Sequence, residues 1–162
     1  MQKHVALRNT HVKLLGFDLV SLTQNGTSFQ RRGIALSLVE TLGTVTLRDM
    51  KPNKFLRFGI DDGTAFIPCI LWLNHHSSSF LARRHPNPHD LHLAADAAAR
   101  FAALVNIGAV VRVRGRLSSY QGAIQVTVSD VVVEKDPNAE ILHWLDCVRL
   151  ARHCYNLLNQ PQ

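Results

Sequence analysis

Three β-type runs rich in apolar and β-branched residues lie between residues 37 and 74, and turn sequences separate them, which predicts β-strands. The expected strands are residues 37–48, 55–60 and 65–74. The segments between them, DMKPNK and DDGT, contain the residue types that favour tight turns. The pattern therefore predicts a three-strand meander. Gly43 lies midway along the first strand, where a glycine is typical of a bulge or sharp coil.

Shorter apolar runs precede the meander. Residues 11–22 are apolar and predict a further strand, followed by the turn-rich sequence TQNGTS. Arg31, Arg32 and Gly33 lie between apolar neighbours, which indicates a tight hairpin leading into the long strand. Residues 1–28 are interpreted as an N-terminal extension of the domain.

The second half of the chain predicts helix, strand, strand and helix. An alanine-rich stretch at residues 91–107, which Gly108 ends, favours a helix. Two β-branched alternating runs follow at residues 109–117 and 124–133. Apolar residues then recur at helical spacing over residues 137–158.

This order of elements predicts a mainly β fold with helices. Five main strands, with a helix between the third and the fourth, match an OB-fold, which is a five-stranded Greek-key barrel. A chain of 162 residues fits a single domain of this kind, with the barrel at about residues 29–135 and a C-terminal helix at about 137–158. In this fold, nucleic acid is bound by the second and third strands and by two loops beside them.

The positive charge of the chain is concentrated in two segments. Eighteen Lys and Arg against twelve Asp and Glu give a net charge of +6 and favour an anionic partner over charge that serves solubility alone. Segments 43–58 and 109–122 together hold seven basic residues and one acidic residue, Asp49. The candidate phosphate-binding residues are Arg48, Lys51, Lys54, Arg57, Arg112, Arg114 and Arg116.

Aromatic side chains near these cations are candidates for stacking on bases. Tyr120 in the last loop is favoured for contact, whereas for Trp72 in the third strand base contact and a place in the barrel core are both open. Phe55, Phe58 and Phe66 alternate with polar residues and are interpreted as barrel core. The three arginines of residues 112–116 have a second interpretation, in which they only solvate one face of a strand.

Other patterns do not indicate catalysis, a metal or a membrane segment. The histidines, among them His75, His76, His85, His89 and His92, match no ligand spacing. Asp61 and Asp62 are interpreted as turn formers, and no catalytic triad, P-loop or GxGxxG occurs. The three cysteines form no CxxC pair, and no apolar stretch approaches the roughly 20 residues that span a bilayer. We therefore expect a non-enzymatic intracellular protein without a cofactor.

The C-terminal helix carries more apolar surface than one barrel can cover. Its main apolar face consists of Ile141, Trp144, Leu145, Val148 and Tyr155. Leu142, Leu150, Cys154 and Leu157 extend this surface on a second flank. An exposed remainder predicts a partner-binding helix. The alternative is that the helix only caps its own barrel.

Several of these motifs together resemble a known family. LGTV, FGIDDGT, ILWLN, IGAVVRVRGRLSSYQG and DPNAEILHWLDC are closely similar to the Stn subunits of the CST telomere complex, which contains Ctc, Stn and Ten. The resemblance covers nearly all of residues 10–155 and is strongest to the short, single-domain plant type. A more distant resemblance is to the middle subunit of replication protein A.

The resemblance implies binding of G-rich single-stranded telomeric DNA, pairing with the small Ten subunit through the C-terminal helix, and assembly with Ctc at chromosome ends in the nucleus. It leaves open a contact with DNA polymerase alpha-primase. It implies that Trp72 and Tyr120 stack on bases. Relatives outside plants have an arginine where this chain has Ser118, and Arg116 is the candidate to replace it. The alternatives are a protein-interaction module with little DNA binding, and a general single-strand binder of the replication protein A type.

Overall fold

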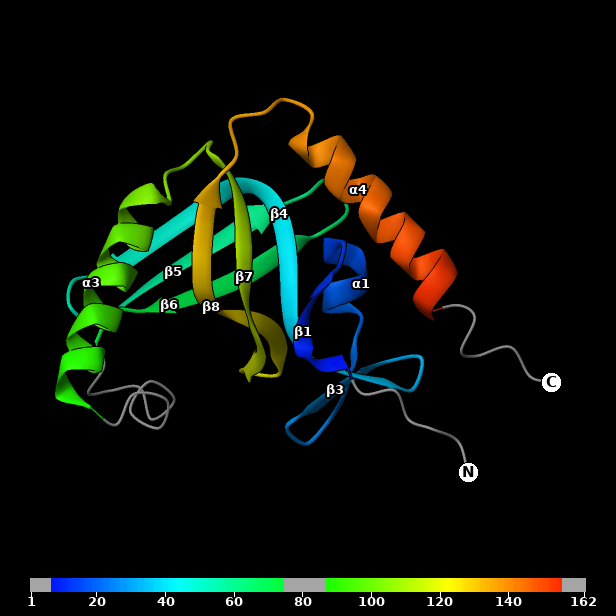
Figure 1. Ribbon diagram of the computed structural model, residues 1–162, viewed down its shortest axis with the longest axis horizontal. Coiled ribbons are helices and arrows are strands. Elements are labelled where there is room, and N and C mark those ends of the chain that lie inside the picture. The colour runs from blue at the N-terminus through cyan, green and yellow to red at the C-terminus, as the bar shows by residue number, and fades with distance from the viewer. Residues whose placement is uncertain (1–6, 75–86, 156–162) are drawn as a thin grey trace.

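Five strands close into a barrel in the computed structural model, which describes residues 7–74 and 87–155 (Figure 1). They are β4 (Ile34–Lys51), β5 (Phe55–Asp61), β6 (Phe66–Trp72), β7 (Val110–Tyr120) and β8 (Ala123–Val133). β4, β5 and β6 form an antiparallel meander, β6 pairs parallel with β8, and β8 pairs antiparallel with β7. β7 returns to β4 and closes the ring. The predicted OB-fold is confirmed.

The long strand β4 belongs to both sides of the barrel. Residues 38–44 pair with β7, and residues 44–51 pair with β5. Gly43 lies next to this change of partner, and a Cβ atom there would be 2.7 Å from the backbone oxygen of Asp61. The register shift itself falls between Val45 and Leu47. Glycine therefore permits the close approach, and the irregularity predicted at Gly43 lies three residues further on.

The N-terminal segment differs from the single strand expected at residues 11–22. β1 (Leu7–Lys13) pairs parallel with β4 and ends before α1 (Gly16–Val20) begins. The helix forms because its first amide groups find partners in the β5–β6 turn. The Gly16 amide donates to the Asp62 carboxylate at 2.6 Å, and the Phe17 amide donates to the Thr64 hydroxyl at 2.9 Å.

A small hairpin then leads into the barrel. β2 (Thr23–Asn25) pairs with β3 (Ser28–Arg31), which pairs with the start of β4. Arg32 and Gly33 form the turn between β3 and β4 with φ angles of 49° and 80°, as a type I′ hairpin requires. The hairpin predicted at Arg31 to Gly33 is confirmed.

Two helices lie on opposite sides of the barrel in Figure 1. α3 (Pro88–Leu104) contacts β6 and β8 and contributes Ala98, Ala102 and the following Val105 to the core. α4 (Ala139–Leu150) continues as the π-helical segment η1 (Ala151–Tyr155). The predicted helices at residues 91–107 and 137–158 are thus present with shifted boundaries, and residues 156–158 lie outside the described part of the chain.

Candidate nucleic-acid interface

The outer face of β5 and β6 is built by the alternation of side chains along each strand. Leu56, Phe58 and Ile60 point inward and are almost fully buried. The residues between them point outward, where each lies beside its antiparallel partner on β6. These outward pairs are Phe55–Trp72, Arg57–Ile70, Gly59–Pro68 and Asp61–Phe66. The face therefore carries aromatic side chains at both ends and a cation between them.

Trp72 and Tyr120 join one cluster through two other side chains. The rings of Trp72 and Phe55 meet edge to face, with centroids 5.9 Å apart. The Arg57 guanidinium carbon lies 4.9 Å from the centroid of Phe55 and 4.4 Å from that of Tyr120. Lys51 Nζ is 5.7 Å from the Phe55 centroid. We call Phe55, Arg57, Trp72 and Tyr120 the aromatic cluster.

Local turn chemistry positions Tyr120. It ends β7 opposite Ala123 of β8, and Gln121 and Gly122 between them have φ angles of 50° and 79°. These angles fit a two-residue type I′ turn, which keeps the strands paired up to Tyr120. The tyrosine side chain remains 43% exposed and reaches Arg57 on β5. Its ring is therefore accessible to a ligand on the outer face.

Arg57 combines a fixed position with an unused donor. Its guanidinium lies between two rings, while its Nε is buried and lacks a hydrogen-bond partner among the described residues. A buried donor of this kind usually finds an acceptor, and a phosphate oxygen suits a guanidinium well. Lys51 and Lys54 are exposed beside it at the β4–β5 turn. Three of the seven predicted cations thus lie close to the predicted stacking residues.

Arg48 has an intramolecular partner. Its Nε donates at 2.8 Å to the carbonyl of Val105, the residue that caps the C-terminus of α3. A cation at a helix C-terminus satisfies a free carbonyl and interacts favourably with the helix dipole. The guanidinium of Arg48 therefore stabilises the junction of α3 with the barrel, and a phosphate contact would be additional.

Arg112 and Arg114 belong to an ion-pair cluster near α4. Arg112 contacts Glu40 at 2.6 Å and Glu134 at 2.7 Å, and Arg114 contacts Glu40 at 2.7 Å. Glu40 is only 3% exposed, and burial raises the pKa of its carboxyl. The hydrogen bonds and charges of the two arginines outweigh burial and bring this pKa below its ordinary value.

Arg116, the third of the arginine stripe formed by Arg112, Arg114 and Arg116, also has a partner, and so has the nearby Ser118. Arg116 Nη1 donates to the Ser37 hydroxyl at 3.1 Å, and the Ser118 hydroxyl hydrogen-bonds that of Thr127 at 2.8 Å. Arg112 is eight residues from Tyr120 along β7, on the order of 25 Å at the usual rise per residue. The structure thus separates the start of the stripe from the aromatic cluster.

The phenylalanines correct the sequence interpretation. Phe58 is buried at 1% exposure, as expected for barrel core. Phe55 is half-buried on the outer face, and Phe66 is 45% exposed there. The expectation that all three fill the core is therefore wrong for Phe55 and Phe66. The reason is strand register, because both residues lie on the opposite side of their strand from the core residues.

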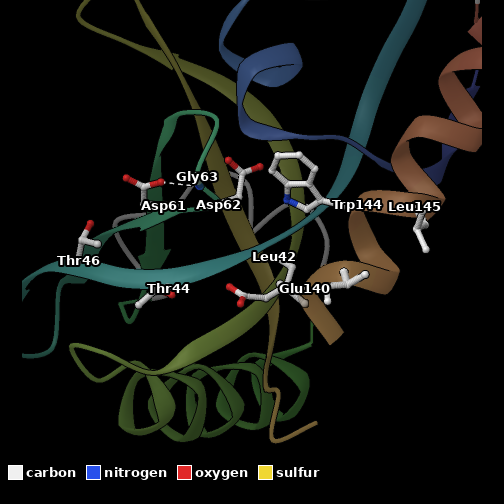
Figure 2. A pocket seen from close by; sticks show the side chains of 10 residues that line it. Leu42, Thr44, Thr46, Asp61, Asp62, Gly63, Glu140, Trp144 and Leu145 are labelled. Atoms are coloured by element: carbon white, nitrogen blue, oxygen red, sulfur yellow. Dashed lines mark hydrogen bonds between the residues drawn. The ribbon is translucent and has the colours of Figure 1, made fainter. Parts of the chain in front are cut away.

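The exposed face of α4 borders a groove (Figure 2). α4 packs on β1 and β4 through Ala139, His143 and Cys147. This leaves Ile141, Trp144, Leu145 and Val148 exposed by 62%, 41%, 57% and 45%. Trp144 points toward the turn containing Asp61, Asp62 and Gly63, across a groove of about 630 Å³. The floor of the groove is Leu42, Thr44 and Thr46 of β4.

Four of the five predicted partner-binding residues are therefore exposed together. The side chain of Tyr155, the fifth, lies outside the described part of the structure. The alternative, in which α4 only caps the barrel, accounts for the buried face of the helix and leaves its apolar outer face without a partner among the described residues.

For the described residues, the structure tests whether histidines could bind a metal and whether a helix could span a membrane. No three His, Cys, Asp or Glu side chains there gather as a metal site would require. His89 and His92 are exposed on α3, whereas His75, His76 and His85 lie outside the described ranges. Among the described helices, none combines the length and apolar character needed to cross a membrane.

Comparisons with known proteins agree with this architecture. A family model described as an OB-fold nucleic acid binding domain matches residues 39–134. The chain is 48% identical over 156 residues to the CST complex subunit STN1 of Arabidopsis thaliana, which covers 94% of this chain and 96% of that protein.

Two solved structures have the same fold. The structure entitled "Crystal structure of S. pombe Stn1-ten1 complex" matches with a TM-score of 0.70 at 14% identity, over 92% of this chain and 96% of that chain. A replication protein A heterotrimer bound to ssDNA matches with a TM-score of 0.66 at 18% identity, over 94% of this chain and 100% of that chain.

Proposed function

Because this chain belongs to the STN1 subunits of CST complexes, a family with an OB-fold nucleic acid binding domain, we propose that it binds single-stranded, G-rich telomeric DNA. The aromatic cluster carries the proposal, since it places the exposed Tyr120 ring, the half-buried Trp72 ring and a cation with an unused donor, Arg57, on one face. Its role is to protect chromosome ends in the nucleus and to support telomere replication. It performs no catalysis of its own.

In the proposed complex, bases stack on Trp72 and Tyr120, and the phosphates run past Lys51, Lys54 and Arg57. Stacking on an aromatic ring is available to every base and contributes about 1–3 kcal/mol per base. The other four predicted cations already have intramolecular partners. We assign to these, Arg48, Arg112, Arg114 and Arg116, a supporting electrostatic attraction rather than the closest contacts.

We further propose that α4 binds the small Ten subunit. The proposal is supported by the exposed apolar residues of α4 and by the fold shared with the S. pombe structure, whose title names Stn1 with ten1. An apolar helical face bordered by a groove suits docking against another domain. Assembly with Ctc, and a contact with DNA polymerase alpha-primase, are proposed from the family alone.

The α4 surface also supports a second candidate, a protein-interaction module with little DNA binding. Two sets of variants separate the DNA-binding role from the partner-binding role. Trp72→Ala with Tyr120→Ala should lower affinity for DNA roughly ten- to a hundredfold, from the stacking energy of two bases, and should leave Ten binding intact. Trp144→Ala with Leu145→Ala should weaken Ten binding and leave DNA binding intact.

The experiment is fluorescence anisotropy of a labelled telomeric G-strand oligonucleotide at two salt concentrations, with unlabelled duplex as competitor. Salt-sensitive binding that the duplex does not displace is expected. Unchanged affinity of the Trp72/Tyr120 double variant would refute the site. Equal affinity for oligonucleotides without guanine would favour a general single-strand binder of the replication protein A type, and absence of binding would favour the interaction module.

A further inference from the structure

The outer face of β5 and β6 continues beyond the aromatic cluster to a second exposed ring. Phe66 lies at the start of β6, six residues from Trp72, or roughly 20 Å along the strand at the usual rise. Its side chain is 45% exposed. An exposed phenylalanine that is part of a flat strand surface offers a ring face to solvent at a cost in hydration. The exposed part of the ring is therefore accessible to a ligand on the outer face.

Gly59 determines how the Phe66 ring lies. A Cβ atom at residue 59 would be 2.0 Å from both Cε2 and Cζ of Phe66, so the ring tip lies directly over the glycine. Any larger residue at position 59 would push the ring away from the strand. Glycine at this position therefore allows the ring tip to lie against the strand in the unbound protein.

A groove beside Phe66 extends the surface toward Tyr120. It has a volume of about 440 Å³ and is lined mainly by apolar groups from three parts of the chain. These are Val20, Leu22 and the polar Gln24 from the N-terminal segment, Phe66 and Pro68 from β6, and Gly122, Ala123 and Ile124 from the β7–β8 turn and β8. Gly122 is two residues from Tyr120, so the groove adjoins the aromatic cluster on the same side of the barrel.

The charges near this groove favour a base over a phosphate. Asp61 and Asp62 lie at this end of β5, and both carboxylates are already held by the backbone. The Gly63 amide donates to Asp61 at 2.7 Å, and the Gly16 amide donates to Asp62 at 2.6 Å. The cations of the face, Lys51, Lys54 and Arg57, lie toward its other end. The apolar face of a base fits here, while phosphates would be repelled.

We propose that Phe66 and the groove beside it form an additional base-stacking subsite for the same single DNA strand. The inference rests on the proposed function and adds to it the course of the strand along β6, from Trp72 past Tyr120 to Phe66. A track of this length lies within the range of roughly 4–16 nucleotides that one OB-fold occupies.

The test measures affinity against oligonucleotide length. Labelled single strands from about 4 to about 16 nucleotides are titrated with wild type, Phe66→Ala and Phe66→Trp. Phe66→Ala should lower affinity about five- to tenfold for the longer strands and leave the shortest unaffected, because only longer strands reach the subsite. Phe66→Trp preserves an aromatic ring and should retain most of the affinity.

Two further variants control the interpretation. Phe17→Ala removes a phenylalanine that is 63% exposed on α1 and does not line the groove, so its affinities should equal those of wild type at every length. Gly59→Ala leaves Phe66 in place but displaces its ring, and should reproduce the length-dependent loss.

The outcomes separate the subsite from the proposed function. If wild type binds no single strand, the proposed function fails. If wild type binds and Phe66→Ala matches it at every length, the subsite is refuted while the aromatic cluster stands. A loss of affinity in Phe66→Ala that is equal at all lengths would also overturn the subsite. Wild-type DNA affinity of this variant together with reduced capture of Ctc would overturn it too, because the surface would then be a protein contact.

Discussion

Replacing Glu40 with glutamine should destabilise the fold more than its single-atom change suggests. The side chain is 3% exposed and accepts hydrogen bonds from Arg112 at 2.6 Å and Arg114 at 2.7 Å. Lys13, 4.0 Å from Glu40, in turn contacts Asp146 of α4 at 2.7 Å. Glutamine keeps the shape but leaves two guanidinium groups around an uncharged amide.

The expected loss of stability follows from how deeply the side chains of Glu40, Arg112 and Arg114 are buried. Removing one partner of a buried ion pair typically costs about 3–5 kcal/mol. The low end applies here, because the arginine side chains are 21% and 46% exposed and can recover some hydration. A loss of about 3 kcal/mol in a domain of this size lowers Tm by roughly 6–12 °C.

The pH dependence provides an independent check. In the folded protein the pKa of the Glu40 carboxyl is below its ordinary value of 4.5, because the two arginines outweigh the opposing effect of burial. A lowered folded pKa means that this stabilisation is present above about pH 4.5 and is lost as pH falls through the folded pKa. The difference in Tm between wild type and Glu40→Gln should therefore narrow in acid.

Thermal unfolding followed by circular dichroism at pH 7 and in acid measures both effects. Glu134→Gln is a matched control, since Glu134 accepts one bond from Arg112 and is more exposed, at 20%. It should lower Tm less than Glu40→Gln does. A Glu40→Gln variant with the wild-type Tm at pH 7, or a Tm difference that does not change in acid, would contradict the reasoning.

Three other changes have defined outcomes. Arg57→Met should lower DNA affinity and reduce the slope of log affinity against log salt by about 0.7, as expected for one lost phosphate contact; a salt titration with an unchanged slope would exclude that contact. Gly43→Ala should destabilise the protein by about 1–3 kcal/mol in urea unfolding, because its Cβ would meet the backbone of Asp61 at 2.7 Å, and a wild-type midpoint would disprove the close approach. Burial lowers the pKa of His143 below 6.5, so the stability of the wild-type protein should fall as pH drops below about 6.5. His143→Gln should flatten this dependence, and parallel profiles of stability against pH for wild type and variant would refute the role of His143.

The sequence predicted most of the barrel because alternation and turn residues are local signals. It also predicted the exposed face of α4, since helical spacing shows how wide an apolar stripe is. It did not predict α1, whose first amide groups bind Asp62 and Thr64 about 46 residues away in the chain. Tertiary hydrogen bonds of this kind override a local apolar pattern.

Long-range pairing also explains why the sequence did not indicate the ion pairs of Arg112 and Arg114. Glu40 stands in an apolar run, and its partners Arg112 and Arg114 are more than 70 residues away. Nothing in the local sequence shows that two of the three stripe arginines would be neutralised. Phe55 and Phe66 were misjudged because alternation identifies two faces of a strand but does not tell which face is the core. The outward position of Arg57, on the same face as Phe55, could have indicated this register.

The shared strand β4 has a consequence for how the protein is made. Leu38 in β4 pairs with Arg116 in β7, so the barrel cannot close until a segment 78 residues further along has been synthesised. At roughly 5–20 residues per second, a ribosome needs about 4–16 s for that interval. During this time β4 and the meander expose apolar core residues and an unpaired edge, which are the features that chaperones bind and that promote aggregation. Folding is thus expected to be slow, to depend on long-range closure, and to be sensitive to truncation before β7.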